Sequence, residues 1–178
     1  EKNGMDYDES EVIVTSGATE ALFIALFGIL NPGDEVILPA PYWVSYIELI
    51  RMVGGVPVVV TATEEEHFKL SAEKLEAAIT PKTKAMILNN PSNPTGMMYS
   101  REELEAIAAV CLKHEIYVIS DEIYACLAYD GKKSTSFAEL GPEIKDLTVL
   151  VSGVSKAYAM TGWRIGYACA NDTLAKIM

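Results

Sequence analysis

The sequence contains few of the residues that build metal centres or disulfide frameworks. Its 178 residues include three cysteines and two histidines. Cys111, Cys126 and Cys169 are far apart and odd in number, and no Cys/His cluster has the spacing of zinc ligands. His67 and His114 lie in polar contexts typical of loops or helix ends. The sequence therefore predicts no metal site, and Cys111, in an Ala/Val/Leu-rich helical stretch, is expected to belong to the core.

Basic residues and long apolar runs are also scarce. The formal net charge is −11, whereas a nucleic-acid or anionic-membrane surface needs a basic face. The longest apolar run, residues 21–30, ends at Asn31-Pro32-Gly33 and is too short to cross a bilayer. No secretory signal opens the chain. We therefore expect a cytoplasmic protein that binds neither nucleic acid nor membrane.

What is present is typical of a globular domain. Half of the residues are hydrophobic and 22% are charged, without repeats or low-complexity tracts. The length suits one domain with a single core, and no linker divides residues 1–178. The chain opens at Glu1-Lys2-Asn3-Gly4 and closes at Met178 inside an apparent helix. We therefore expect a single domain that belongs to a longer chain.

Short apolar runs rich in β-branched residues alternate with helical patterns along the chain. Strands are expected at residues 12–15, 35–38, 56–61, 85–88, 116–120, 148–152 and 165–170. Helices are expected at residues 18–30, 44–53, 71–79 and 101–114, and from residue 171 onward. The helix at 101–114 begins with a capping box, with Ser100 at the N-cap and Glu103 three residues later. This alternation predicts an α/β fold of three layers, α/β/α, with a mostly parallel sheet covered on both faces.

Polar residues or glycine follow four of the expected strands, at the edge where ligands bind in such sheets. The four segments are residues 16–19, 89–96, 121–124 and 152–156. The first, Ser16-Gly17-Ala18-Thr19, opens a helix with small residues. A helix N-terminus with small side chains can bind a phosphate closely, although a simple helix cap would look the same. It matches neither a dinucleotide fingerprint nor a Walker A loop.

Two charged residues at strand ends are candidates for chemistry. Asp121 directly follows an apolar strand, where a carboxylate is costly unless it is paired. A pyridinium nitrogen would be a suitable partner, and so would a loop cation or a helix N-terminus. Lys156 lies among small residues, where its amine could be desolvated and so become nucleophilic. Arg164, eight residues on, could clamp a phosphate.

The segment that contains Lys156 resembles a known family signature. Residues 153–166, Gly-Val-Ser-Lys-Ala-Tyr-Ala-Met-Thr-Gly-Trp-Arg-Ile-Gly, resemble the lysine-attachment signature of class I/II aminotransferases, the fold-type I enzymes that use pyridoxal 5′-phosphate (PLP). Four further segments resemble the same family in the same order: Ser-Gly-Ala-Thr-Glu-Ala-Leu at 16–22, Pro-Tyr-Trp-Val-Ser-Tyr at 41–46, Asn-Asn-Pro-Ser-Asn-Pro-Thr-Gly at 89–96 and Ser-Asp-Glu-Ile-Tyr at 120–124. The resemblance spans residues 12–170.

The resemblance implies a role for each matched residue. Lys156 would form a Schiff base with PLP and later move a proton between substrate and cofactor. Asp121 would pair with the pyridine nitrogen so that the ring acts as an electron sink. Tyr124 and Asn93 would hydrogen-bond the phenolic oxygen of the ring, and Trp43 would stack on it. Trp43 and Asn93 would also border the substrate.

The phosphate of the cofactor would lie against a second group of matched residues. These are Gly17, Ala18, Thr19 and Arg164. Many family members have serine at the position of Gly153. Here the contact of that hydroxyl with the phosphate must be missing or come from Ser155 or Ser152, and Ser155 is included among the cofactor-binding residues.

By this resemblance the protein is expected to be a homodimeric aminotransferase. It would move an amino group between an amino acid and a 2-oxo acid, with aspartate as the first substrate guess. Two alternatives stay open: another fold-type I enzyme, such as a C–S lyase or a synthase, and the PLP-sensing domain of a transcription regulator. The family's N-terminal arm and its C-terminal small domain, which carries the arginine for the substrate α-carboxylate, have no counterpart in residues 1–178.

Overall fold

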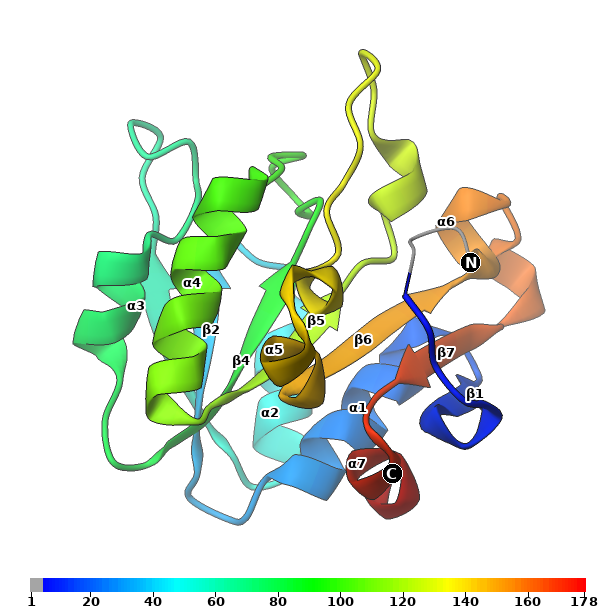
Figure 1. Cartoon of the computed structure of the whole chain (residues 1–178), viewed down its shortest axis with the longest axis horizontal. Coiled ribbons are helices and arrows are strands. Elements are labelled where there is room, and N and C mark those ends of the chain that lie inside the picture. The colour runs from blue at the N-terminus through cyan, green and yellow to red at the C-terminus, as the bar shows by residue number, and fades with distance from the viewer. Residues whose placement is uncertain (1–4) are drawn as a thin grey trace.

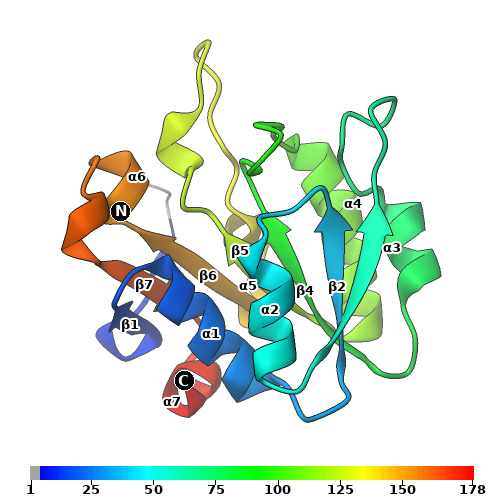
Figure 2. The same cartoon turned by 180° about the vertical axis from the view of Figure 1, so that it is seen from behind.

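The apolar runs form a single seven-stranded sheet in the computed structural model, which describes residues 5–178 (Figures 1 and 2). The first four residues, Glu1 to Gly4, lie outside the described residues. The strands are β1 (Val12–Thr15), β2 (Glu35–Ala40), β3 (Val56–Thr61), β4 (Thr83–Asn89), β5 (Tyr117–Asp121), β6 (Thr148–Gly153) and β7 (Gly166–Cys169). Their order across the sheet is β1-β7-β6-β5-β4-β2-β3.

Five neighbouring strands, β3, β2, β4, β5 and β6, run parallel, which confirms the predicted mostly parallel sheet. The exception is β7, which pairs antiparallel with both β6 and β1. A parallel neighbour needs a crossover, usually a full helix. Between β6 and β7 the chain has only the one-turn helix α6 (Val154–Ala157) and the 3-10 turn η4 (Thr161–Trp163), so β7 returns beside β6.

Helices cover both faces of the sheet, as the alternating pattern predicts. The helices are α1 (Ala18–Ile29), α2 (Ser45–Met52), α3 (Ala72–Ala78), α4 (Arg101–His114), α5 (Pro142–Asp146) and α7 (Asp172–Ile177), and the remaining 3-10 turns are η1 (Glu9–Glu11), η2 (Ala125–Leu127) and η3 (Phe137–Leu140). Helices α1, α2 and α7 pack on one face and α3, α4 and α5 on the other, so three layers result (Figures 1 and 2).

The strands alternate between two hydrophobic cores. In β2, Val36 and Leu38 belong to the core formed with α1 and α2, whereas Ile37 belongs to the core formed with α3 and α4. Because successive strand residues point to opposite faces, a strand buried on both faces is a continuous apolar run. This is why residues 35–38 show no polar alternation. Cys111 is fully buried in the second core, as expected.

Local capping sets several helix boundaries close to those expected. The Ser100 hydroxyl accepts from the Glu103 amide (3.2 Å), and the Glu103 carboxylate accepts from the Ser100 amide (2.7 Å), so the predicted capping box is confirmed. Asn171 caps α7 by accepting from the Leu174 amide (2.9 Å). The short helices α5 and α6 were not predicted, because one or two turns show no readable periodicity.

The structure was searched for metal-binding clusters and for membrane-spanning helices. Within residues 5–178, no group of three or more His, Cys, Asp or Glu side chains is placed to hold a metal ion. Nor does any helix in this part of the chain have the length and apolar character needed to cross a membrane.

We predict that Ser100→Ala lowers the free energy of unfolding by about 1 kcal/mol, the usual cost of losing an N-cap hydroxyl. The Glu103 amide then loses its side-chain acceptor. Ser100→Thr keeps a hydroxyl and should retain most of the stability. Urea denaturation measures both variants, and an alanine variant as stable as the unsubstituted protein would contradict the capping role.

Candidate active site

The carboxyl ends of β1, β2, β4, β5 and β6 lie at one edge of the sheet, and the antiparallel β7 begins there. A cavity of about 340 Å³ opens at this edge. It is lined by Ala18, Thr19, Leu22, Trp43, Tyr46, Asn93, Asp121, Ile123, Tyr124, Ser155, Lys156, Thr161 and Arg164. Nine of the ten predicted site residues are in this lining, the exception being Gly17. Segments far apart in the sequence thus meet at one place.

Gly17 lies behind the lining and allows Arg164 to approach the start of α1. Its φ is +83°, and a Cβ there would lie only 2.2 Å from Nη2 of Arg164. Gly166, paired with Thr15 across the two strands, is equally restricted, because its Cβ would lie 2.3 Å from the carbonyl carbon of Gly17. The two glycines therefore bring the guanidinium beside the N-terminus of α1, an arrangement suited to a phosphate.

The loop between Lys156 and Arg164 folds back sharply so that both reach the cavity. Ala159 (φ 53°) and Arg164 (φ 54°) are in the left-handed region, which is uncommon for residues with a side chain. Nη1 of Arg164 donates to the carbonyl oxygen of Thr161 at 3.0 Å. Thr161 itself lines the cavity and was not predicted as a site residue, because the loop's folded path is not readable from sequence.

Asp121 is the last residue of β5 and is buried, with 3% of its surface exposed. Oδ2 accepts from the Tyr46 hydroxyl (2.6 Å) and Oδ1 accepts from the Ile123 amide (3.1 Å). Burial raises the pKa of Asp121, and the two hydrogen bonds only partly oppose this. Among the described residues, Asp121 has no lysine, arginine or histidine within ion-pair distance. The carboxylate is therefore short of a cationic partner and borders a cavity that could hold one.

Tyr46 is a site residue that the sequence analysis missed. It is buried, and desolvation together with the nearby Asp121 carboxylate raises the pKa of its phenol, which keeps it a hydrogen-bond donor. The Trp43 ring meets the Tyr46 ring edge to face at 5.4 Å between centroids. Both lie in the segment 41–46 that resembles the family, but only a structure reveals that Tyr46 reaches Asp121, 75 residues away.

Asn93 and Tyr124 are held together by a hydrogen-bonded chain between β4 and β5. Nδ2 of Asn93 donates to the Tyr124 hydroxyl at 3.2 Å, and the Asn93 amide donates to Oδ1 of Asn89 at 2.7 Å. Nδ2 of Asn89 in turn donates to the carbonyl oxygen of Asp121 at 2.9 Å. These hydrogen bonds fix the polar side chains at the ends of β4 and β5 relative to each other. Asn89 was quoted in the resemblance but given no role.

Lys156 lies in the one-turn helix α6 at the mouth of the cavity. Its Nζ lies 5.8 Å from the centroid of the Tyr124 ring, within reach of a cation–π contact. The side chain is exposed, so the expectation that its amine is desolvated is wrong for the chain described. The small residues on either side belong to the strand end and the short helix, and they do not enclose the amine.

The two serines considered near Gly153 point to different sides of the sheet. Ser155 lines the cavity with Lys156, whereas Ser152 lines a separate hollow on the opposite face. Ser155 is therefore the one placed for a contact in the cavity. At Gly153 itself, a Cβ would lie 2.8 Å from the carbonyl oxygen of Ile165, so a hydroxyl there would require β7 to shift.

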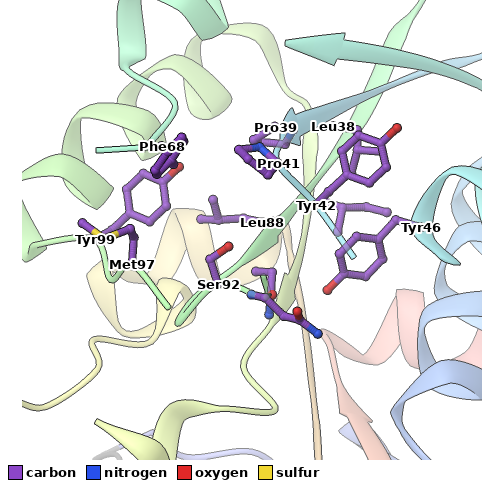
Figure 3. A pocket seen from close by; sticks show the side chains of 13 residues that line it. Leu38, Pro39, Pro41, Tyr42, Tyr46, Phe68, Leu88, Ser92, Met97 and Tyr99 are labelled. Carbon is purple, nitrogen blue, oxygen red and sulfur yellow. The ribbon is translucent and has the colours of Figure 1, made fainter. Parts of the chain in front are cut away.

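A second, much smaller cavity of about 20 Å³ lies beside the first and shares Tyr46 and Asn93 with it (Figure 3). Its walls include Pro39, Pro41 and Leu88. This volume holds about one water molecule. The smaller cavity is therefore too small for an amino acid.

Comparisons with known proteins place this geometry among aminotransferases. The family model for aminotransferase class I and II matches residues 1–178. The chain is 54% identical over 175 residues to the aspartate aminotransferase of Geobacillus stearothermophilus, covering 98% of this chain and 44% of that protein. The aspartate aminotransferase structure from Rhizobium meliloti matches with a TM-score of 0.96 and 45% identity, over 98% of this chain and 44% of that chain.

A second structure, the aspartate aminotransferase from Thermus thermophilus with maleate, matches with a TM-score of 0.94 and 46% identity. That match covers 99% of this chain and 45% of the other. The chain thus spans less than half the length of the relatives it matches.

We predict that Asp121→Asn stabilises the protein without cofactor at neutral pH. Because burial raises the folded-state pKa of Asp121 above the ordinary value of an aspartate, this carboxyl favours folding when protonated. That contribution is complete below about pH 3.8 and is lost as the pH rises through the raised folded pKa. An amide has no such loss.

Chemical denaturation of both proteins as a function of pH measures the effect. The stability difference in favour of Asp121→Asn should be smallest in acid and grow toward neutral pH. A variant that is less stable than the unsubstituted protein at neutral pH would show that Asp121 already has an adequate partner.

Proposed function

Because this chain belongs to the aminotransferase class I and II family, as its motifs predict, we propose that its protein is a PLP-dependent aminotransferase. The cofactor would lie in the cavity at the carboxyl edge of the sheet. The observation that carries the proposal is the buried, cation-less carboxylate of Asp121 in the same cavity as Lys156 and Arg164. One ligand with a pyridinium, an aldehyde and a phosphate would satisfy all three.

The lining residues fit such a ligand at each end. The guanidinium of Arg164 and the free amides at the start of α1 suit a phosphate, and small Ala18 leaves room for it. Asp121 suits a protonated ring nitrogen, and the Trp43 indole offers a flat surface for stacking. Ser155 supplies a hydroxyl next to Lys156.

PLP, when bound, supplies an electron sink for the carbanion formed at the substrate Cα. Side chains of this protein would bind and orient the cofactor and move the protons. Asp121 would keep the proton on the ring nitrogen, since a buried carboxylate strongly favours a cation beside it. Tyr124, linked to Asn93, donates toward the ring oxygen. The amine of Lys156 would hold the cofactor covalently and, when free, would take the proton from the substrate Cα and return it to a neighbouring carbon.

Aspartate is the substrate we propose. Two observations support it: relatives at about half identity are named aspartate aminotransferase, and one solved relative was studied with maleate, a four-carbon dicarboxylate. We also propose that the protein is a cytoplasmic homodimer, in keeping with the family resemblance of its motifs.

We predict that Lys156→Ala abolishes covalent attachment of PLP, because no other lysine among the described residues lines the cavity. The protein in its natural full length is incubated with PLP, reduced with borohydride and digested. Mass spectrometry should find the pyridoxyl group on the peptide that contains Lys156. Lys132→Ala, which removes a lysine from outside this cavity, serves as the matched control and should leave the modification intact.

The same preparation tests the reaction. Adding aspartate alone should convert bound PLP to its amine form and release oxaloacetate in equal amount. If amino acids of every class leave the bound cofactor unchanged, the protein is not an aminotransferase, and a PLP-sensing role gains support. Release of pyruvate, ammonia and hydrogen sulfide from cysteine and water, in place of the amine form of the cofactor, would indicate a C–S lyase.

A further inference from the structure

Glu122 is a buried carboxylate that the cofactor site does not use. It follows Asp121, so its side chain points to the opposite face of the sheet, toward the second core. Only 3% of its surface is exposed. Its Oε1 accepts three hydrogen bonds, from the hydroxyls of Ser120 (3.0 Å) and Ser136 (2.7 Å) and from the Phe137 amide (3.1 Å).

These three bonds join two distant parts of the chain. Ser120 belongs to β5, whereas Ser136 and Phe137 end a long excursion that begins at Tyr124 and projects beyond the sheet edge (Figures 1 and 2). The carboxylate of Glu122 therefore closes a loop whose first residue, Tyr124, lines the cofactor cavity.

The backbone of Glu122 is tied to both sides of the same site. Its amide donates to the carbonyl oxygen of Val151 in β6 (2.8 Å), five residues before Lys156. Its carbonyl oxygen accepts from the Ala125 amide (2.9 Å), which turns the chain at Tyr124. Any movement of the Glu122 backbone would thus also displace Tyr124 and the strand that leads to Lys156.

The surroundings of Glu122 contain mostly neutral or like-charged groups. Burial is the largest influence on its carboxyl and raises its pKa to about 7, while the three donors oppose the rise and Glu139 adds to it. Further titratable side chains line the hollow that Glu122 borders, and among the described residues they are Tyr7, Cys126, Lys132, Lys133, Tyr158, Tyr167 and Cys169. A carboxyl in this setting lowers the stability of the fold when it is ionised. Its contribution is therefore to hold its three hydrogen-bond donors in fixed positions.

We propose that Glu122 is a positioning residue for the cofactor site, which holds Tyr124 in the cavity by fastening the end of the 124–137 segment to β5. This inference rests on the proposed function, since Tyr124 acts only on a bound cofactor. An apolar side chain of similar size would fill the same space but would leave the segment unfastened and three donors unpaired.

The test compares Glu122→Ala with Glu122→Gln, which keeps an oxygen acceptor for the three donors. Glu139→Ala is the matched control, because Glu139 is a carboxylate in η3, two residues beyond this segment, and pairs with Arg101 (3.4 Å) instead. Three properties are measured on the full-length protein: hydrogen exchange of residues 124–137 without PLP, the dissociation constant of PLP, and the pH midpoint of the visible absorbance change of bound PLP.

In Glu122→Ala we expect faster exchange across residues 124–137 and a dissociation constant raised about tenfold, as for one lost hydrogen bond. The absorbance midpoint should move in the same direction as in Tyr124→Phe. A merely structural role would lower stability without that spectral change. Glu122→Gln and Glu139→Ala should resemble the unsubstituted protein in all three measurements.

Faster exchange with an unchanged absorbance midpoint and an unchanged dissociation constant would overturn the inference. If Glu122→Ala does not fold, Ser136→Ala removes only the shortest of the three bonds and should shift the same properties less, so no change in them would equally overturn it. The unsubstituted protein separates the two proposals. Failure of PLP to attach to it contradicts the proposed function, whereas normal attachment with an unaffected Glu122→Ala contradicts this inference alone.

Discussion

The burial of the Asp121 carboxylate is the constraint on which the candidate site depends. A carboxylate with 3% exposure and two neutral donors is costly unless a cation lies beside it. The surrounding groups do not supply that cation, but they fix the carboxylate in place: Tyr46 holds one oxygen and the Ile123 amide the other. The fold thus keeps a carboxyl group in a fixed position beside the cavity, and no cation among the described residues pairs with it. Burial of the Asp121 carboxyl lowers the stability of the folded protein, but it leaves a binding site that is already formed.

The reversed direction of β7 is what completes the site around that carboxylate. If β7 ran parallel to β6, its amino end would lie at the far edge of the sheet, and Arg164 with it. Because β7 returns directly, Arg164 lies next to the start of α1. Gly17 and Gly166 permit this contact, since a Cβ at either position would overlap its neighbours. The guanidinium of Arg164 and the carboxyl group of Asp121 thereby line one cavity.

The sequence predicts the fold well, because the signals for it are local. Continuous apolar runs such as 35–38, the capping box at Ser100 and the alternation of strand and helix patterns need no distant partner to be read. The direction of β7 was not predicted, because it depends on the short connection through α6 and not on the strand's own residues.

The candidate site was predicted to the extent that its residues end strands or belong to recognisable motifs. Nine predicted residues line one cavity for this reason. Tyr46, Thr161 and Asn89 were missed as contributors, because each acts through a contact that only folding creates. The exposure of Lys156 was also misjudged, since small neighbours in the sequence do not determine how much of a side chain water reaches.

The protonation state of the cofactor's ring nitrogen tests this account most directly. It can be measured by the ¹⁵N chemical shift of labelled PLP bound to the full-length protein. We predict that the nitrogen stays protonated at about pH 8, well above the range where a carboxyl remains neutral, and that Asp121→Asn removes the proton. An unprotonated nitrogen in the unsubstituted protein at that pH would contradict the pairing with Asp121 and the role of the cavity built around it.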